Sequence, residues 1–413
     1  MQMFSIRYTF LSLFIFLVMS CQSKLPAQVT PAHKTTEKLE DESHKSIIVG
    51  AERIAELKEI LKNKRVGIVG NQTSMVGATH LVDTLLSEGV QVIKIFSPEH
   101  GFRGDADAGE HVASNVDART GLPIVSIYGD NKKPKAEQLK GLDVLVLDLQ
   151  DVGARFYTYI STLHYIMEAA AENNLSVLVL DRPNPNGHYV DGPIRKEGFV
   201  SFIGMHPIPV VHGMTIAEIA QMINGEGWLD KKVKCNLSVL SCLNYERTMK
   251  YSLPVSPSPN LRSDEAIALY PSLCFFEGTD VSVGRGTPTP FEIYGHPTLK
   301  GQAGFDYTFK PVSSFGAKQP LLENQQCYGE NLHEYAKNNE IHQLEIKWLI
   351  AAYKAMGSKE SFFSRKRFFD LLAGTDELRI QISAGKTEQE IRASWEEGLD
   401  NFKQTRAQYL LYK

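Results

Sequence analysis

Glu99 is the side chain of this sequence best placed to transfer a proton. It stands in a tight Pro-Glu-His-Gly segment, residues 98–101, directly after a predicted buried strand. Burial of a carboxyl group at such a position favours its protonated form, which a proton donor to a leaving oxygen needs. The structural alternative is that Glu99 caps the following turn or pairs with Arg103. His100 is expected to be a hydrogen-bond partner of Glu99 or a purely structural residue.

Polar side chains also follow other predicted strands, at the point where each strand ends. They are Asn71, Asp148, Asp151, Arg182, Asn184 and His212. Ligands bind beyond the carboxyl ends of the strands in open α/β sheets, so these residues predict a site at one sheet edge. Asp148 and Asp151 lack a second His or Asp cluster at ligand spacing, and we predict no metal there. An alternative to a direct role for Asp151 is an internal ion pair with Arg155 at the start of a helix.

A second informative segment runs from residue 256 to residue 292. Alternating prolines in Ser256-Pro-Ser-Pro-Asn260 predict a rigid polar loop. Glycines beside Asp and Arg allow a backbone to approach a ligand closely, and Arg can hold a carboxylate with two hydrogen bonds. The side chains of this segment expected at a site are Asn260, Arg262, Tyr270, Glu277, Asp280 and Arg285. A structural crossover between domains would have the same composition.

Short apolar runs alternate with helical stretches over the first half of the chain. Strands are predicted at 65–69, 90–96, 123–127, 144–148, 177–181 and 208–211, and helices at 51–62, 80–88, 159–173 and 215–224. Strands that are apolar almost throughout are buried on both faces, as in parallel sheets. We therefore predict an α/β fold whose catalytic domain, residues 46–275, has a Rossmann-like, open, mostly parallel sheet.

The remainder, residues 276–413, is predicted to form a smaller auxiliary α/β domain. It is expected to contain helices at 332–338, 360–372 and 387–409 and a strand at 377–382.

The composition, and the residues that follow the first predicted strand, argue against several classes of ligand. The 413 residues are 43% hydrophobic and 22% charged, as in ordinary globular proteins of more than one domain. The net charge of −4, without a long basic block, argues against nucleic acid. The first strand is followed by Gly70-Asn-Gln and lacks G-x-G-x-x-G, so a dinucleotide is disfavoured and no cofactor is predicted.

The amino-terminal segment predicts export. Residues 1–21 have a basic start, a short apolar run and the ending Val-Met-Ser-Cys21, which resembles a bacterial lipobox. We expect lipidation of Cys21, with simple cleavage or an uncleaved anchor as alternatives. Residues 22–45 are polar and predict a flexible tether. The protein is thus expected in the cell envelope, anchored at the periplasmic face of a bacterial membrane. The four other cysteines lack CxxC spacing, and either disulfides or buried thiols suit them.

Long ordered motifs resemble those of the DUF1343 family, which includes the exo-β-N-acetylmuramidases. They are Gly70–Ser74, Phe96–Gly104, Asp148–Tyr159, Asp181–Gly187, His212–Thr215, Ser258–Leu261, Tyr270-Pro271, Glu277–Asp280 and the ending 391–412. The resemblance implies a Rossmann-like domain, an auxiliary domain and an active site between them. It also implies release of terminal β-1,4-linked N-acetylmuramic acid from the non-reducing end of peptidoglycan fragments. By the same resemblance, Glu99 is the catalytic carboxylate and Tyr270 its partner at the site.

Glycoside hydrolysis requires a proton donor and a second group that balances the oxocarbenium-like charge. Glu99 is the predicted acid/base, and the second group is open among Asp148, Asp151, Glu277, Asp280, Tyr270 and the substrate's own acetamido oxygen. The lactyl carboxylate of muramic acid calls for a cation, for which the candidates are Arg182, Arg262, Arg285 and, less suitably, Arg103. The sugar hydroxyls are assigned to Asn71, Asn184, Asn260 and His212. Two other functions fit less well. One is a non-catalytic muropeptide-binding lipoprotein, and the other is an esterase or amidase, for which no G-x-S-x-G elbow is present.

Overall fold

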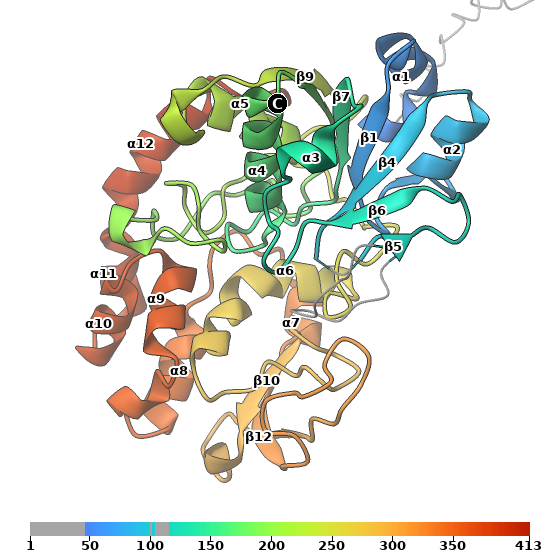
Figure 1. Ribbon diagram of the computed structural model, residues 1–413. Helices are drawn as coiled ribbons and strands as arrows, with labels where there is room; N and C mark the ends of the chain where they lie inside the picture. The colour runs from blue at the N-terminus through green and yellow to red at the C-terminus, as the bar shows by residue number, and fades with distance from the viewer. Residues whose placement is uncertain (1–45, 100, 104–114) are drawn as a thin grey trace, which may run out of the picture. The chain divides into compact units, whose positions relative to one another are not determined.

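A seven-stranded sheet organises the computed structural model, which describes residues 46–99, 101–103 and 115–413 (Figure 1). Across the sheet the strands are β5 (Asn115–Val116), β6 (Pro123–Ser126), β4 (Val92–Ser97), β1 (Val66–Gly70), β7 (Val144–Asp148), β8 (Ser176–Leu180) and β9 (Asn236–Leu240). Every neighbouring pair is parallel except β5 with β6. The predicted open, mostly parallel α/β sheet is confirmed.

The order of the strands reverses between β1 and β7. From β1 the chain continues outward to β4 and β6, whereas β7, β8 and β9 follow one another on the other side. The register pairs Gly70 with Asp148, so the loops that leave β1 and β7 begin side by side. Open α/β sheets bind their ligands at such a reversal point, beyond the carboxyl ends of the strands.

Helices cover both faces of the sheet, as the apolar strands require. On one face α1 (Ile54–Leu61) and α2 (Leu81–Ser87) pack against side chains such as Ile68 and Val146. On the other face α4 (Tyr159–Glu172) and α5 (Ile216–Gly225) pack against Leu145 and Leu147. The short α3 (Ala136–Leu139) precedes β7. Because successive strand residues point to opposite faces, each Val-Leu-Val-Leu run contributes to both cores.

The carboxy-terminal part begins around α6 (Asp264–Leu273) and contains a small antiparallel sheet. Its strands are ordered β10 (Ile293–His296), β12 (Cys327–Asn331) and β11 (Tyr307–Phe309). The helices that follow are α7 (His333–Asn338), α8 (Lys347–Ala355), α9 (Lys366–Ala373), α10 (Glu377–Ser383), α11 (Glu388–Ala393) and α12 (Glu396–Arg406). One hydrophobic cluster extends from Leu163 of α4 to Phe275 and Phe369. The division of the chain at residue 275 stays a prediction.

Three predicted elements are wrong. Residues 208–211 are not a strand of the sheet, because Val211 only bridges Ala154 and Asp191, and β9 takes that place. Residues 377–382 form α10, in which Leu378 and Ile382, four residues apart, point into the core. The expected long final helix is divided into α11 and α12 around the buried Trp395.

The four described cysteines are free and buried, which decides for thiols over disulfides. Among the described residues, no helix has the length and apolar character needed to cross a bilayer.

Arg155 connects the first part of the chain to the last. Its buried guanidinium donates from Nη1 to the carbonyl oxygens of Pro193 (2.9 Å) and Ile208 (2.6 Å), and from Nη2 to that of Leu372 (2.9 Å). Burial, with the positive charge of Arg195 nearby, lowers the pKa of Arg155 to about 9. These carbonyl partners take the place of the ion pair with Asp151 that the sequence left open.

Candidate active site

Glu99 lies at the carboxyl end of β4, next to the reversal point of the sheet. The hydroxyl of Tyr128 donates to its Oε1 over 2.8 Å, and that of Thr158 donates to Oε2 over 3.4 Å. Thr158 precedes the first residue of α4, so the amino-terminal end of that helix faces the carboxylate. Burial and the negative charge of Glu99 raise the pKa of Tyr128 above its ordinary value. Tyr128 therefore remains a hydrogen-bond donor throughout the physiological pH range.

Two buried tyrosines at the start of α4 extend the site. Tyr159 accepts a hydrogen bond of 2.6 Å from Nδ2 of Asn71, and Tyr157 donates one of 2.7 Å to the carbonyl of Pro257. Their rings meet edge to face with centroids 4.9 Å apart. Burial raises the pKa of Tyr159, and the charges of Glu99 and Asp151 raise it further. Tyr159 thus lies within the electrostatic reach of both carboxylates.

Asp151 is a buried carboxylate with an incomplete set of hydrogen bonds. Its Oδ2 accepts from the backbone N–H of Gly153 over 2.8 Å and lies 3.6 Å from Nε2 of His212. Nδ1 of His212 accepts from the N–H of Met214, which leaves the ring proton on Nε2. Oδ1 of Asp151 and Nε2 of His212 have no hydrogen-bond partner within the described part of the chain. Buried polar atoms without partners are uncommon and often mark functional sites.

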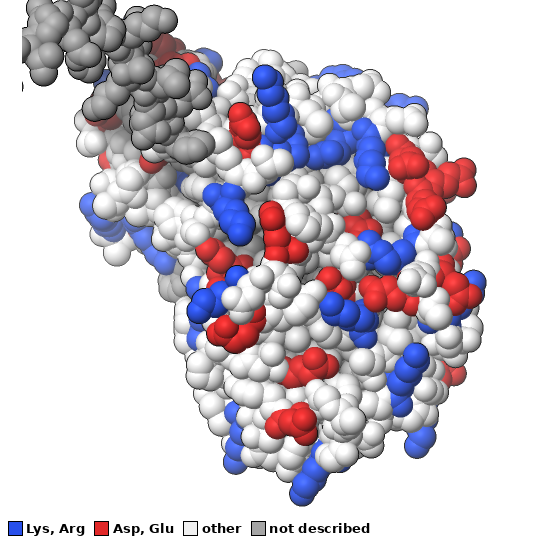
Figure 2. Space-filling model, turned by 180° about the vertical axis from the view of Figure 1, so that it is seen from behind, with Lys and Arg blue, Asp and Glu red and all other residues white. Residues whose placement is uncertain are grey.

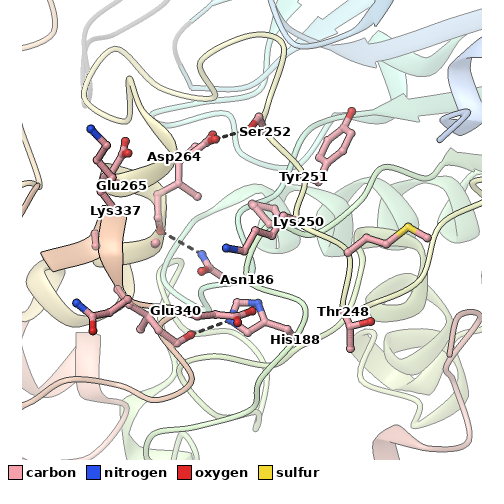
Figure 3. Close-up of a pocket in the computed structure, with 17 residues that line it drawn as sticks. Asn186, His188, Thr248, Lys250, Tyr251, Ser252, Asp264, Glu265, Lys337 and Glu340 are labelled. Atoms are coloured by element: carbon pink, nitrogen blue, oxygen red, sulfur yellow. Dashed lines mark hydrogen bonds between the residues drawn. The ribbon is translucent and has the colours of Figure 1, made fainter. Parts of the chain in front are cut away.

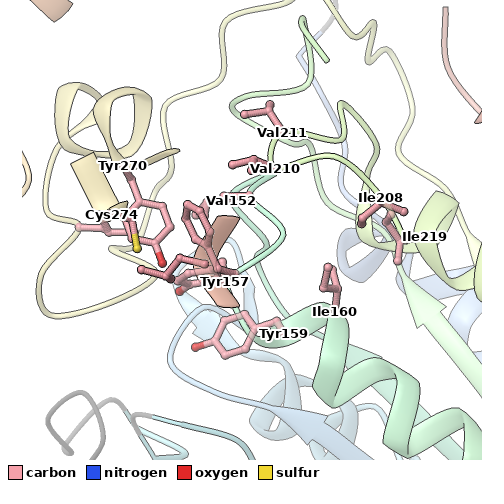
Figure 4. Packing of buried hydrophobic residues seen from close by; sticks show 14 of the residues in the cluster. Val152, Tyr157, Tyr159, Ile160, Ile208, Val210, Val211, Ile219, Tyr270 and Cys274 are labelled. Atoms are coloured by element: carbon pink, nitrogen blue, oxygen red, sulfur yellow. The ribbon is translucent and has the colours of Figure 1, made fainter. Parts of the chain in front are cut away.

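Tyr270 joins the tyrosine pair to a second group of polar residues. Figure 4 shows Tyr270 and Cys274 facing Tyr157 across the core, and the Tyr270 and Tyr157 ring centroids are 6.0 Å apart. On the other side, Sγ of Cys274 lies 3.7 Å from Oε2 of Glu277. Nε of Arg285 donates to Oε1 of Glu277 over 2.6 Å. Burial, Cys274 and the charge of Glu277 all raise the pKa of Tyr270.

Glu277 and Arg285 line a groove with a volume of about 970 Å³. Arg365 also lines it, so two arginines border this groove. Arginine side chains suit an anionic ligand such as a carboxylate.

Comparison with known proteins supplies the family. Residues 66–265 match the description "Exo-beta-N-acetylmuramidase NamZ, N-terminal", and residues 268–412 match the corresponding C-terminal description. The chain belongs to the NamZ family of exo-β-N-acetylmuramidases. A relative in Bacillus subtilis (strain 168), named peptidoglycan beta-N-acetylmuramidase NamZ, is 38% identical over 377 residues, which are 87% of this chain and 89% of the relative. The predicted family and glycosidase class are confirmed.

Solved structures of the family share the fold. A DUF1343 family protein from Bacteroides fragilis NCTC 9343 is 46% identical, with a TM-score of 0.81 over 89% of this chain and 99% of its own. A second protein from the same organism is 30% identical, with a TM-score of 0.76 over the same shares of the two chains.

Asp148 and Arg182, two residues predicted at the site from the sequence, form an internal ion pair. Nε of Arg182 donates to Oδ1 of Asp148 over 2.6 Å, and Nη2 donates to Oδ2 over 2.9 Å. Asp148 is fully buried and Arg182 is 3% exposed, so each neutralises the other inside the protein. Nη2 of Arg182 also donates to the carbonyl of Met75. Arg182 thus joins the segment after β8 to the end of β7 and, through Met75, to the segment after β1.

Three of the predicted sugar-binding side chains also bond within the protein. Asn71 accepts from Thr73 through Oδ1 besides orienting Tyr159. Nδ2 of Asn184 donates to the carbonyl of Met214, and Nδ2 of Asn260 donates to that of Gly316. All three asparagines are buried, and their hydrogen bonds connect the loops around the site.

The remaining predicted residues have other partners or lie outside the described part of the chain. Arg262 is exposed and donates to the carbonyls of Pro259 and Phe315. Asp280 lies near His296. Burial lowers the pKa of His296, and the negative charge of Asp280 opposes this shift. Arg103 pairs with Asp83 and Asp117. His100 lies outside the described residues, as does Cys21.

Tyr128, Tyr157, Thr158 and Tyr159 were not singled out from the sequence. Tyr128 follows β6 by two residues, and the rule that selected Glu99 after β4 selects Tyr128 as well. The other three lie in the motif Asp148–Tyr159, which supplied the family resemblance. As for metals, in residues 46–99, 101–103 and 115–413 the group of side chains with ligand spacing includes neither Asp148 nor Asp151.

Proposed function

We propose that this chain is an exo-acting glycoside hydrolase that releases terminal β-1,4-linked N-acetylmuramic acid from the non-reducing end of peptidoglycan fragments, with Glu99 as acid/base. Membership of the NamZ family supports the activity and the class of substrate. The observation that supports the role of Glu99 is its place beyond β4, beside the reversal point, with Oε1 held by Tyr128.

The hydrogen bond from Tyr128 helps to hold the carboxyl group of Glu99 in one orientation at the end of β4. Thr158 donates to the other oxygen, so both oxygens of Glu99 are positioned by the protein. Donation of a proton from Glu99 to the glycosidic oxygen expels the leaving sugar, and the resulting carboxylate then takes a proton from the attacking water.

Asp151 is the carboxylate that we propose as the electrostatic partner of Glu99. Asp148 is neutralised by Arg182, and Glu277 by Arg285, whereas Oδ1 of Asp151 has no hydrogen-bond partner among the described residues. A buried negative charge stabilises a developing oxocarbenium ion more strongly than an exposed one. The negative charges of Glu99 and Asp151 both raise the pKa of Tyr159.

Recognition of the lactyl carboxylate is proposed for Arg285. Within the described residues, Glu277 takes its Nε, which leaves the two terminal nitrogens for a second carboxylate. The cationic lining of the groove adds attraction. On the face shown in Figure 2, basic and acidic side chains are interspersed, and the net charge is −4. An anionic sugar is therefore recognised by individual arginines and not by the overall field.

The decisive experiment compares two substrates in Glu99→Gln. We expect kcat/KM for the disaccharide of N-acetylmuramic acid and N-acetylglucosamine to fall by about 10³-fold, because its leaving group needs a proton. The kcat/KM of a nitrophenyl N-acetylmuramide, whose leaving group needs little protonation, should fall much less, since the later activation of water by Glu99 affects only kcat. Asp151→Asn should slow both substrates similarly. Glu137→Gln, an exposed glutamate on α3, is the control.

Equal losses for the two substrates in Glu99→Gln would remove its role as acid. Binding of the disaccharide without any product from the unaltered protein would instead favour a non-catalytic binding protein. Mass analysis of the products separates glycoside cleavage from deacylation.

Export and anchoring by a lipid on Cys21 are a further part of the proposal, supported by the lipobox-like ending Val-Met-Ser-Cys21. It predicts that the protein fractionates with membranes and that its mature amino-terminal peptide carries the mass of acyl chains. Cys21→Ser should release the protein from the membrane fraction. Membrane association that persists unchanged in this variant would exclude the lipid anchor.

A further inference from the structure

His188, Glu340 and His342 form a cluster of metal-ligating groups. Each contributes one ligand atom, and these atoms all lie within 4.8 Å of one another. His188 belongs to the segment after β8, whereas Glu340 and His342 belong to the loop after α7. Nε2 of His342 is 3.5 Å from Oε2 of Glu340, and the rings of His188 and His342 have centroids 5.6 Å apart.

A hydrogen bond to the neighbouring loop fixes the tautomer of the His188 ring. Its Nε2 lies 2.7 Å from the carbonyl oxygen of Ile341, so this nitrogen carries the proton and donates. Nδ1 then keeps the lone pair that a metal requires. Metal-bound imidazoles nearly always donate their other N–H to a carbonyl or carboxylate, which fixes the tautomer.

The two loops are fastened to each other beside the cluster. The backbone N–H of Leu344 donates to Oδ2 of Asp191 over 2.7 Å. Arg392 donates to the same Oδ2 over 2.5 Å and to the carbonyl of Leu344 over 2.9 Å. These bonds hold the two backbone segments in place beside the cluster.

We propose that His188, Glu340 and His342 bind a zinc ion. Two imidazoles and one carboxylate are a donor set that zinc accepts, with water in the fourth position. Zinc bonds of about 2.1 Å in a tetrahedron place the ligand atoms about 3.4 Å apart. The 3.5 Å between Glu340 and His342 already matches, and both side chains are exposed enough to adjust and to admit the ion.

The ion would clip the segment after β8 to the loop after α7. Figure 3 shows His188 and Glu340 on the wall of a pocket that Asn186 and Lys250 also line. Glu99 is not among the residues of this pocket. The role proposed for the ion is therefore structural, and the proposed acid/base mechanism contains no step at this cluster.

The test uses the untagged full chain, freed of metal by a chelator. Zinc titrated by calorimetry should bind to this site with a micromolar Kd and raise Tm by several degrees. Cobalt should give the visible absorption of a tetrahedral ion. His342→Ala and Glu340→Gln should each weaken this binding at least tenfold. His342 is exposed, so its loss should leave the fold intact.

His333→Ala is the matched control. His333 also lies beside glutamates, 2.7 Å from Glu292 and 3.9 Å from Glu334, but these do not form a cluster with ligand spacing within the described residues. Unchanged zinc affinity in this variant supports the proposal. Zinc affinity and a Tm shift in His342→Ala equal to those of the unaltered chain would overturn it.

Discussion

The hydroxyl of Tyr128 donates a 2.8 Å hydrogen bond to Oε1 of Glu99 and so joins the ends of two neighbouring strands. The register of β4 and β6 explains the contact, because Ser97 pairs with Ser126. Two residues beyond this pair, the segment after β4 presents Glu99 and the segment after β6 presents Tyr128, at the same level beyond the sheet. The parallel sheet itself therefore sets the geometry of the proposed acid.

Replacing Tyr128 by Phe should lower kcat about tenfold and leave KM nearly unchanged. The phenylalanine fills the same space but no longer fixes Oε1 of Glu99, so the acid is held less well while substrate contacts persist. Steady-state kinetics with the disaccharide measure both parameters. A raised KM at constant kcat would show that Tyr128 binds substrate and does not position Glu99.

Replacing Arg285 by Met should raise KM for N-acetylmuramides by about 10- to 100-fold, the loss expected for a charge-assisted hydrogen bond. The corresponding N-acetylglucosaminide lacks the lactyl carboxylate, so its weaker turnover should change little. Arg262→Met is the control, because Arg262 is exposed and bonds only to backbone carbonyls among the described residues. Equal losses for both sugars would remove the carboxylate-binding role of Arg285.

Asp181 should make the folded state less stable as pH rises. Burial raises its pKa to about 7, although Tyr412, Thr215 and Ala217 donate hydrogen bonds to it. Between about pH 4 and pH 7 the native carboxyl keeps a proton that the unfolded chain has lost. The free energy of unfolding should fall there by up to about 1.4 kcal/mol per pH unit.

Asp181→Asn should remove this contribution and flatten the profile. Urea unfolding at several pH values between 4 and 8 measures the slope, which does not depend on the cost of the substitution itself. Identical slopes in the two proteins would mean that Asp181 is ionised in the native state over the whole range.

The sheet followed from the sequence because it depends on local pattern, and the same pattern places the candidate site at one edge of the sheet. Apolar runs such as 144–148 are long enough to identify buried strands, and polar residues after them identify the edge where ligands bind. The same pattern failed at β9, whose alternating Asn236–Leu240 is half exposed at the sheet edge. It also failed at α10, where apolar residues at every second position suit a strand or a helix turn equally.

The roles of individual polar residues depend on contacts that no local pattern contains. Asp148 and Arg182 stand 34 positions apart, yet they neutralise each other in the core. The tyrosines at 157 and 159 gain their meaning only when α4 brings them to Asn71 and Pro257. The sequence identifies residues whose side chains could act on or bind a substrate, but it does not show which of them are already bonded to other groups of the protein.

The buried guanidinium of Arg155 limits how such proteins can be recombined. It lies in the segment matched by the N-terminal family description, and its partner carbonyl at Leu372 lies in the segment matched by the C-terminal one. A chimaera made from the halves of two homologues would have to reproduce this backbone position, or else leave a charge stranded in the interior. We therefore expect the two halves of this chain to work together only as a matched pair, and a half taken from a homologue to replace its counterpart poorly.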